Sequence, residues 1–595
     1  MTHDHDLVLR PTEAQIAAAL AAPPGRTGAD LVVETLRGLG AGTVFTTPPT
    51  AGAAHPSDGG GAAGGGAGAD AGARADEGAR ADAGARGDEG ARADAGARGD
   101  EGARADAGAR ADEGARADTG ARADEGAARG DALAAALRRS DLRPVTLAGA
   151  PAAGHAADAH GRLTGEAAPL FLADPDTALA ALPALRAGAG SPLLLVVAGE
   201  LPAAHPLVGS VHRAGAASRI PSAVAEAWEA ALTLPHGPVL VEIPAGVLAE
   251  ETLVPPVTGV DASPHEAAPR PELTAVAAHL LAGAVRPVLV AGGGVIRADA
   301  AGKLRALAER LQVPVVCTLA GRGAFPPAHP LSLGVWTGPA AGGAASLLTD
   351  FLEDADLLVA LGTTLGEGEV PDPERPFLPD GTIVQIDADP DALEAARPAL
   401  GIPADARLAL QALAETVTER TDPFASQRVA MLRMDMAVAD ASEGAGEAPG
   451  AALAAAVRAA LPDRVPAFWD LTPATAPAWT RFEVRRPNTA HAAPAAPGGA
   501  GFALPAAIGA AAAEPGEPVL AVSDARVALG ALAEVPALVA SGADVTWLIL
   551  DAGPELPGLL ETLGLPTRIA GEGPDALGEA LKSTLPKPGP TAVLA

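Results

Sequence analysis

The segment Arg286-Pro-Val-Leu-Val-Ala-Gly-Gly-Gly-Val295 gives the clearest indication of the fold. Its first half is a short apolar run of the kind that forms a strand covered on both faces, and a helical pattern follows from about Ala300 to Leu311. The three glycines suit a tight strand-to-helix turn, and they equally allow a backbone to approach a phosphate at the start of a helix. A structural turn and a nucleotide site are therefore both open interpretations.

Short apolar runs alternate with helical patterns on both sides of this segment. Such alternation predicts parallel sheets with helices on both faces, repeated in three α/β blocks. Proline clusters near 250–270 and a Gly- and Glu-rich stretch near 420–450 mark the joints, so we expect domains over 1–250, 265–415 and 450–595. Strands are predicted at 43–45, 192–198, 238–243, 287–291, 314–317, 356–361, 382–386, 519–522 and 545–550, and helices at 31–39 and 132–139.

A hexapeptide repeat interrupts the first block. The unit Ala-Arg-(Ala/Gly)-Asp-(Glu/Ala/Thr)-Gly recurs nine times between Ala73 and Gly126. It offers no large apolar side chain to bury, and each glycine costs a helix about 1 kcal/mol relative to alanine. We therefore expect a disordered insertion over about 50–131, either as a solvated linker-like segment or as a charge-mediated interaction segment.

The composition argues against several functional classes. The 595 residues include 42 Lys and Arg against 73 Asp and Glu, which gives a formal net charge of -31. Binding to nucleic acid or to an anionic membrane needs basic surface, so neither partner is expected. The single cysteine, Cys317, excludes an intramolecular disulfide framework and a multi-cysteine metal site. The first residues lack a signal-peptide pattern and no apolar run approaches the ~20 residues of a membrane span, so we expect a cytoplasmic protein.

Six further segments follow one another in a recognisable order and spacing outside the insertion. They are Thr27–Leu36, Ala157–Gly165, Gly321–Gly334, Asp354–Gly362, Ile383–Pro390 and Gly498–Gly509. Together with the glycine turn they resemble the acetolactate-synthase-like family of thiamine-diphosphate (ThDP) enzymes. The resemblance implies three doubly wound parallel-sheet domains: a pyrimidine-binding-type domain, a central Rossmann-like domain and a diphosphate-binding-type domain. It also implies ThDP and Mg²⁺ as cofactors, FAD in some members, and a homodimer or homotetramer whose active sites form between the first domain of one subunit and the third of another.

The catalytic carboxylate of that family is missing from this sequence. The resemblance implies a glutamate that protonates the aminopyrimidine ring of ThDP, and Ala150 holds its place when counted back from His155. Alanine cannot act as a general acid or base. The nearest carboxylates in sequence, Asp141 and Asp158, would need a different geometry. His160 stands where the family has tyrosine, so we interpret it as a packing residue rather than as a base.

This sequence keeps one of the two side-chain ligands that the resemblance implies for the cation site. The turn Ser523-Asp524-Ala525 stands where the family has Gly-Asp-Gly, and Asp551-Ala552 stands where it has an Asn-Asn pair. Asp524 thus keeps one Mg²⁺ ligand, whereas alanine replaces the other. Asp551 is next to the lost position. It is therefore either a displaced second ligand or, like Asp524, an ordinary solvated carboxylate at a strand end.

The opening of the third domain has lost a bulky side chain. Gly498 and Gly499 keep their family places, but Ala500 replaces the large apolar residue that lies beneath the thiazolium ring. The family reaction is decarboxylation of a 2-oxo acid followed by carboligation, and the combined losses predict a catalytically impaired member. Two alternatives are a non-catalytic scaffold or regulatory subunit in a hetero-oligomer with an intact relative, and a nucleotide-binding protein acting through the central domain. Core or interface positions are predicted for Phe468, Trp469, Trp479 and Trp547.

Overall fold

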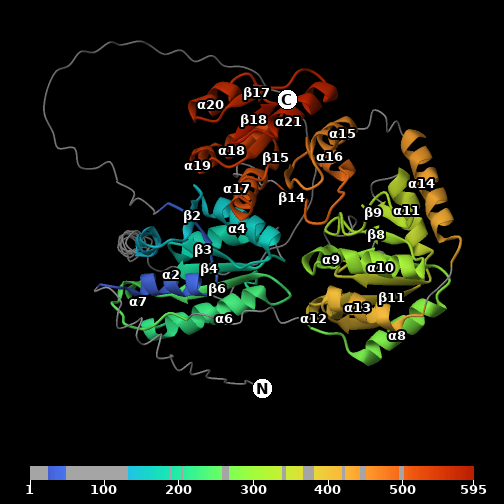
Figure 1. Cartoon of the computed structure of the whole chain (residues 1–595), viewed down its shortest axis with the longest axis horizontal. Helices are drawn as coiled ribbons and strands as arrows, with labels where there is room; N and C mark the ends of the chain where they lie inside the picture. Colours follow the sequence, from blue (N-terminus) through green and yellow to red (C-terminus); the bar gives the residue numbers. More distant parts are fainter. Residues whose placement is uncertain are drawn as a thin grey trace, which may run out of the picture. The chain divides into compact units, whose positions relative to one another are not determined.

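The computed structural model describes ten stretches of the chain. They are residues 25–48, 132–186, 190–202, 206–257, 267–337, 343–365, 381–418, 422–442, 450–494 and 501–595. The insertion predicted over about 50–131 lies outside these residues, so its predicted disorder stays a prediction. The described residues contain three six-stranded sheets with flanking helices (Figure 1). The strands pair in parallel throughout each sheet, which confirms the predicted fold class of three parallel-sheet α/β blocks.

The first sheet has the strand order β2-β1-β3-β4-β6-β5. Its strands are β1 (Thr43–Thr46), β2 (Arg143–Thr146), β3 (Ala168–Leu172), β4 (Leu193–Ala198), β5 (Ser210–Arg213) and β6 (Pro238–Ile243). Its helices are α2 (Gly28–Gly38), a helix over 132–139, α4 (Ala150–Thr164), α5 (Pro175–Arg186), α6 (Ile220–Leu232) and α7 (Ala245–Ala249), with the 3-10 turn η1 (Ala217–Arg219) before α6. Helix α2 begins with a reciprocal capping box between Thr27 and Asp30, which explains where the chain turns helical.

The third sheet repeats the order of the first, β14-β13-β15-β16-β18-β17. Its strands are β13 (Ala467–Leu471), β14 (Ala490–Pro494), β15 (Val519–Asp524), β16 (Val545–Leu550), β17 (Thr567–Ile569) and β18 (Thr591–Leu594). Its helices are α15 (Ala451–Ala460), α16 (Ala476–Arg481), α17 (Ala503–Ala513), α18 (Ala525–Gly530), α19 (Val535–Ser541), α20 (Leu556–Thr562) and α21 (Pro574–Thr584), with the 3-10 turn η3 (Leu532–Glu534) before α19.

The central sheet has a different order, β12-β11-β10-β7-β8-β9. Its strands are β7 (Pro287–Ala291), β8 (Val315–Cys317), β9 (Ser332–Val335), β10 (Leu357–Leu361), β11 (Thr382–Asp387) and β12 (Leu400–Pro403). Its helices are α8 (Pro271–Gly283), α9 (Gly293–Arg297), α10 (Ala301–Leu311), α11 (Gly343–Glu353), α12 (Pro390–Ala396), α13 (Ala406–Thr416) and α14 (Ala425–Ser442). The direction of strand progression reverses between β7 and β10. In open parallel sheets such a reversal opens a crevice at the carboxyl ends of the strands.

Every sheet is covered by apolar cores on both faces, because successive side chains of a strand point to opposite sides. In β4, Leu193, Leu195 and Val197 lie in one core, whereas Leu194, Val196 and Ala198 lie in another. The same division separates Val519 and Ala521 of β15 from Leu520 and Val522. This explains why the inner strands have continuous apolar runs rather than alternating ones.

The first and third sheets share one core across helices α4 and α17. Gly509 of α17 lies so close to α4 that an added Cβ would stand 1.9 Å from the backbone oxygen of Ala156. The large aromatic side chains predicted for the core are buried: Phe468, Trp469 and Trp547 completely, and Trp479 almost completely. Among the described residues, no helix combines the length and the apolar character that crossing a membrane requires.

Candidate functional site

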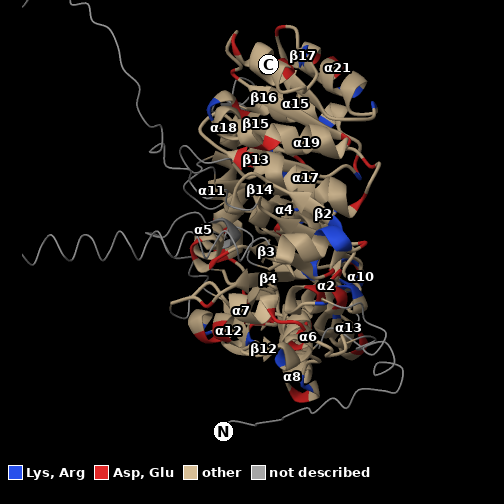
Figure 2. Cartoon of the chain, turned by 90° about the vertical axis from the view of Figure 1, so that its left-hand side faces the viewer, with Lys and Arg blue, Asp and Glu red and all other residues tan. Residues whose placement is uncertain are grey.

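A buried polar chain links the carboxyl ends of the inner strands in the third sheet. The carboxylate of Asp470, near the end of β13, accepts hydrogen bonds from the backbone N–H groups of Phe502 (2.6 Å) and Ala503 (3.0 Å) at the start of α17. It also accepts from the hydroxyl of Ser523 (2.6 Å), which in turn accepts from the indole N–H of Trp547 (3.0 Å). Asp470 therefore fixes where α17 begins relative to β15 and β16. Acidic residues lie beside the labels of β13 and β15 in Figure 2.

The surroundings of Asp470 leave little space. Burial raises the pKa of its carboxyl, and the nearby charge of Asp524 adds to the rise, while the three hydrogen bonds oppose it. Gly501 has a φ of 69°, and an added Cβ there would stand 2.4 Å from Cγ1 of Val527. Only glycine suits this conformation and this space. The Gly498–Ala500 segment just before it, predicted to bind the cofactor, lies outside the described residues.

The predicted metal ligands lie at the ends of neighbouring strands. Asp524 pairs in register with Leu550, the residue before Asp551. The side chain of Asp524 is almost fully buried and caps α18, since its Oδ1 accepts from the backbone N–H of Val527 (3.0 Å). Asp551 is exposed and has a φ of 55°, and Ala552 follows it in a turn against the chain end at Ala595. The two carboxylates therefore have different surroundings.

Asp524 and Asp551 could supply at most two carboxylates to a Mg²⁺ ion, so waters and the phosphates of a cofactor would have to complete its coordination. Magnesium requires near-octahedral oxygen coordination. Within the described stretches, no three His, Cys, Asp or Glu side chains come together in a way that would hold a metal ion. Asp524 is already engaged as a helix cap, and Ser523 and Ala525 on either side add no carboxylate. A site built from Asp524 and Asp551 stays a prediction, and we derive no chemical step through a metal.

The position predicted for the family glutamate, Ala150, lies at the start of α4. Ala150 is the first residue of this helix, and its side chain offers only a methyl group. A carboxylate nevertheless reaches this place from the third sheet. Glu534, the last residue of η3, accepts from the backbone N–H of Ala148 (2.7 Å) and of Gly149 (3.2 Å). Burial raises the pKa of Glu534, while the two backbone bonds oppose the rise.

Glu534 was not identified from the sequence. It stands 386 positions from Ala148 along the chain. A single glutamate between two helical segments carries no local sign of such a contact. Only the packing of the first and third sheets brings the two places together.

Three histidines lie in or beside α4: His155 and His160 are buried within this helix, and His491 of β14 is half-buried near Asp158 and Arg162. Burial lowers the pKa of His155 and of His160 to about 4, and that of His491 to about 3. His155 packs edge-on against Phe502, with ring centroids 5.2 Å apart, and His160 packs edge-on against Phe45 at 5.4 Å. This agrees with the interpretation of His160 as a packing residue.

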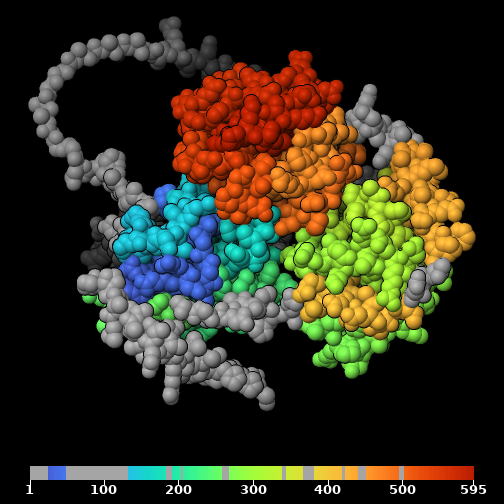
Figure 3. All heavy atoms as spheres, in the orientation of Figure 1, coloured from blue at the N-terminus to red at the C-terminus, as the bar shows by residue number. Residues whose placement is uncertain are grey.

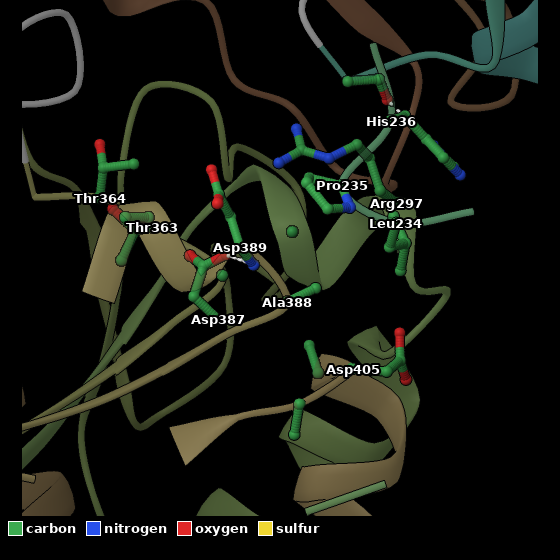
Figure 4. A pocket seen from close by; sticks show the side chains of 16 residues that line it. Leu234, Pro235, His236, Arg297, Thr363, Thr364, Asp387, Ala388, Asp389 and Asp405 are labelled. Carbon is green, nitrogen blue, oxygen red and sulfur yellow. Dashed lines mark hydrogen bonds between the residues drawn. The ribbon is translucent and has the colours of Figure 1, made fainter. Parts of the chain in front are cut away.

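A cavity of about 230 Å³ lies at the carboxyl edge of the central sheet, where the strand order reverses (Figure 4). One wall comes from Gly294, after β7, and Gly362–Thr364, after β10. A second wall comes from Asp387–Asp389, after β11, together with Asp405 before α13. The first domain closes the cavity with Leu234–His236.

The charges around this cavity are unequal. Three aspartates and one arginine, Arg297, line it, and Figure 4 shows the Arg297 guanidinium extending toward the side on which Asp389 lies. Burial raises the pKa of Asp387, while Arg297 lowers it. Asp389 caps α12 and Asp405 caps α13, so both carboxylates also fix helix starts.

Packing accounts for the glycine turn beside the cavity. An added Cβ at Gly292 would stand 2.3 Å from the backbone oxygen of Gly362, and one at Gly294 would stand 2.6 Å from its Cα. The turn opens the short helix α9, of five residues, and the longer α10 begins only at Ala301. The turn between β7 and β10 therefore requires the glycines whether or not a ligand binds there.

Two family descriptions match the sequence. Residues 274–413 match the central domain of thiamine pyrophosphate enzymes. Residues 473–553 match the C-terminal TPP-binding domain of thiamine pyrophosphate enzymes. The first match covers all six strands of the central sheet and most of the residues that line its cavity. The second covers Phe502, Ser523 and Trp547 of the buried polar chain but begins after Asp470.

Known proteins with similar sequences act on different substrates. The acetolactate synthase large subunit of Corynebacterium glutamicum is 38% identical over 200 residues, which are 33% of this chain and 31% of that protein. A probable 2-ketoarginine decarboxylase of Pseudomonas aeruginosa is 32% identical over 306 residues, 51% of this chain and 52% of that protein. The chain thus spans about a third of the first relative's length and about half of the second's. Benzoylformate decarboxylase from Polynucleobacter necessarius has a similar fold, with a TM-score of 0.67, 16% identity and coverage of 96% of this chain and 98% of that one.

Proposed function

Since the chain contains the central and C-terminal domains of thiamine pyrophosphate enzymes, we propose that it is a ThDP-family protein of the acetolactate-synthase type with impaired catalysis. One observation carries the proposal. Ala150 begins α4 at the place of the catalytic glutamate, and the carboxylate that does reach this helix start, that of Glu534, has both oxygens engaged by backbone N–H groups. Neither group is arranged to protonate an aminopyrimidine ring.

The state of the other predicted site residues supports the same proposal. Asp524 caps a helix, Asp551 is exposed, and a buried serine, Ser523, replaces the first glycine of the family turn. ThDP supplies, when bound in an active relative, the carbanion that attacks a 2-oxo acid. This chain keeps the domains that would enclose the cofactor but has lost the proton donor and a full set of cation ligands.

Two measurements test the impairment. Calorimetric titration with ThDP and Mg²⁺, repeated with EDTA, measures whether cofactor binds and whether a cation takes part. Assay of the ThDP-loaded protein with a panel of 2-oxo acids, pyruvate included, measures decarboxylation. We expect turnover far below the ~1 to 1,000 s⁻¹ of ordinary enzymes. Turnover within that range for any 2-oxo acid would refute the proposal.

A scaffold or regulatory role is one consequence of a preserved fold with an incomplete site. The partner would be an intact relative of the same family, because such proteins share the surfaces on which their subunits associate. Mixing the purified chain with an intact acetolactate synthase large subunit and measuring both mass and activity tests this role. A mixture in which each protein keeps its own mass and rate argues against it.

The cavity in the central sheet favours nucleotide binding as a second candidate function. It lies at the strand-order reversal, where open parallel sheets bind ligands. Its aspartates suit hydroxyl groups such as those of a ribose better than they suit a chain of phosphates. Thermal shift measurements with FAD, ADP and NAD test it, and an unmoved melting temperature with all three would dismiss it.

A further inference from the structure

Helix α14 has apolar side chains on two opposite faces. Its inner face packs against α11 and the central sheet, where Val429 is completely buried and Leu432 and Met436 contact the same core as Trp336. In Figure 1 the helix lies on the outer side of α11, and in Figure 3 its outer surface is open. An apolar stripe on a helix of a globular protein normally faces a packed partner.

The outer face gathers large apolar side chains in one line. Phe424, at the start of the helix, is 61% exposed, Met431 is 56%, Met434 is 62% and Val438 is 61% exposed. Residues 431, 434 and 438 follow one another at intervals of three and four, and residue 424 lies one heptad before 431. This alternation of three and four is the pattern of a coiled-coil seam. We call these four side chains the α14 seam.

Methionine content adds to the evidence for a contact surface. The chain has 4 methionines, and the three beyond Met1 all lie in α14. Two of them, Met431 and Met434, occupy the middle of the seam. The flexible thioether side chain adapts to the surface of a partner and is common at such contacts.

Charged residues beside the seam indicate what covers it. Arg428 and Asp435 are one heptad apart on the same flank of the seam, and the opposite flank carries only Ala430 and Ala437. When two such helices pair antiparallel, equal flanks face each other. Arg428, which also pairs with Asp422 of its own chain (2.6 Å), then faces Asp435 of the other copy. In a parallel pair each charge would face an alanine instead. The charges are therefore complementary to a second copy of this helix running in the opposite direction.

We propose that the α14 seam is a self-association surface that pairs antiparallel with α14 of a second copy of this chain about a twofold axis. Such an interface is isologous, since each copy contributes the same residues. The seam is about 21 Å long at 1.5 Å per residue. Its four side chains are few compared with the ~20–30 residues that each partner contributes to a stable complex, so the association is weak and depends on concentration. The inference does not rest on the proposed function.

Sedimentation velocity of the full chain, from about 1 to 100 µM, tests the association. We expect the average mass to rise with concentration. We expect Met431→Asp/Met434→Asp to abolish the rise, because the variant places carboxylates in the seam. Arg433→Asp is the matched control: it adds an acidic side chain at an exposed position of the same helix away from the seam, and it should associate like the wild type. Circular dichroism shows whether each variant is folded. A wild type of constant mass, or a folded seam variant that associates unchanged, overturns the proposal.

Charge reversal tests the antiparallel direction. Asp435→Arg places two arginines opposite each other in each half of the pair, so association should weaken. The double variant Arg428→Asp/Asp435→Arg again places opposite charges face to face, so the association should return to the wild-type level. Arg428 also contacts Asp422 in its own chain (2.6 Å), so the melting temperature of the double variant is measured alongside. A folded double variant that associates no better than Asp435→Arg refutes antiparallel pairing.

Discussion

Glu534 holds the start of α4 through two backbone hydrogen bonds from a different sheet. Glu534→Ala removes a buried carboxylate that accepts from the N–H groups of Ala148, which is exposed, and Gly149, which is half-buried. Hydrogen bonds to a charged group contribute about 1.5–3 kcal/mol, so we expect the free energy of unfolding to fall by about that amount. Urea unfolding followed by circular dichroism measures it.

A matched control separates this effect from loss of charge. Glu572→Ala removes an exposed glutamate of the third domain and should leave the urea midpoint unchanged. The urea midpoint of Glu534→Gln should lie between those of the two alanine variants, since one amide oxygen can replace only one of the two carboxylate acceptors. Equal midpoints for Glu534→Ala and Glu572→Ala would show that the contact contributes nothing.

The buried histidines make stability depend on pH. His155 has an ordinary pKa of 6.5 and a pKa of about 4 in the fold, because burial outweighs the attraction of Asp158. The unfolded chain therefore takes up a proton at a higher pH than the folded chain does. Stability from the neutral ring is complete above about pH 6.5 and is lost as the pH falls toward 4, by about 1.4 kcal/mol per unit for each such group. Urea midpoints at pH 7, 6 and 5 should fall in that order.

A variant that cannot titrate isolates this contribution. His155→Leu should flatten the fall between pH 6.5 and 5 relative to the wild type. The difference between the two proteins removes the opposite contribution of Asp470 and Glu534, whose raised pKa values favour the folded state at low pH. His279→Leu changes an exposed histidine and should keep the wild-type slope. Parallel curves for all three proteins would contradict the assignment.

Helices α4 and α17 pack as closely as their backbones allow. Gly509→Ala places a Cβ 1.9 Å from the backbone oxygen of Ala156, so the helices must move apart. Forcing a methyl group into a packed contact costs about 1–3 kcal/mol.

Gly302→Ala in α10 is the control, since nothing lies within 4 Å of the added Cβ. Alanine there should stabilise by about 0.5–1 kcal/mol through helix propensity. Thermal melts of the two variants should therefore shift in opposite directions, and a shared direction would show that the helices are not in close contact.

Most inner strands could be predicted from the sequence, although β3, β13 and β18 were missed, whereas no edge strand was predicted. The predicted runs at 238–243, 287–291 and 545–550 match β6, β7 and β16 at both ends. Inner strands are buried on both faces, so they form continuous apolar runs. Edge strands are half exposed and mix polar with small residues, so neither periodicity nor hydropathy marks them. All six strands at sheet edges were missed: β2, β5, β9, β12, β14 and β17.

The sequence also located several candidate site residues at the ends of strands, but it did not predict the contacts that these residues make. Asp524 and Asp551 follow neighbouring strands as expected. Asp470 and Glu534, which form most hydrogen bonds at this edge, were not identified, because each acts on a helix start more than 30 positions away. Local patterns identify which residues end a strand, but only tertiary packing shows which of them are already engaged.

On the scale of the whole molecule, Arg322 joins the central sheet to the third domain. Its guanidinium is buried and donates to the backbone oxygens of Trp479 (2.6 Å) and Thr480 (3.3 Å), and it lies 4.6 Å above the Trp479 ring. Burial lowers the pKa of Arg322 to about 10, so it is still charged at neutral pH.

Arg322→Ala removes both hydrogen bonds and the cation–π contact, and the Trp479 carbonyl keeps only its bond from the backbone N–H of Phe482 (3.2 Å). These losses together should weaken the coupling between the two parts by about 2–4 kcal/mol. Differential scanning calorimetry should then show two transitions, with the central part and the third domain unfolding separately, where the wild type shows one cooperative unfolding of both. Arg305→Ala removes an exposed arginine of α10 that pairs with Glu309, and it should keep the wild-type trace. Arg322→Lys should resemble the alanine variant more than the wild type, because an ammonium group cannot reach both carbonyls while stacked on the ring. A single unchanged transition in Arg322→Ala would show that the two parts are held together by the remaining contacts alone.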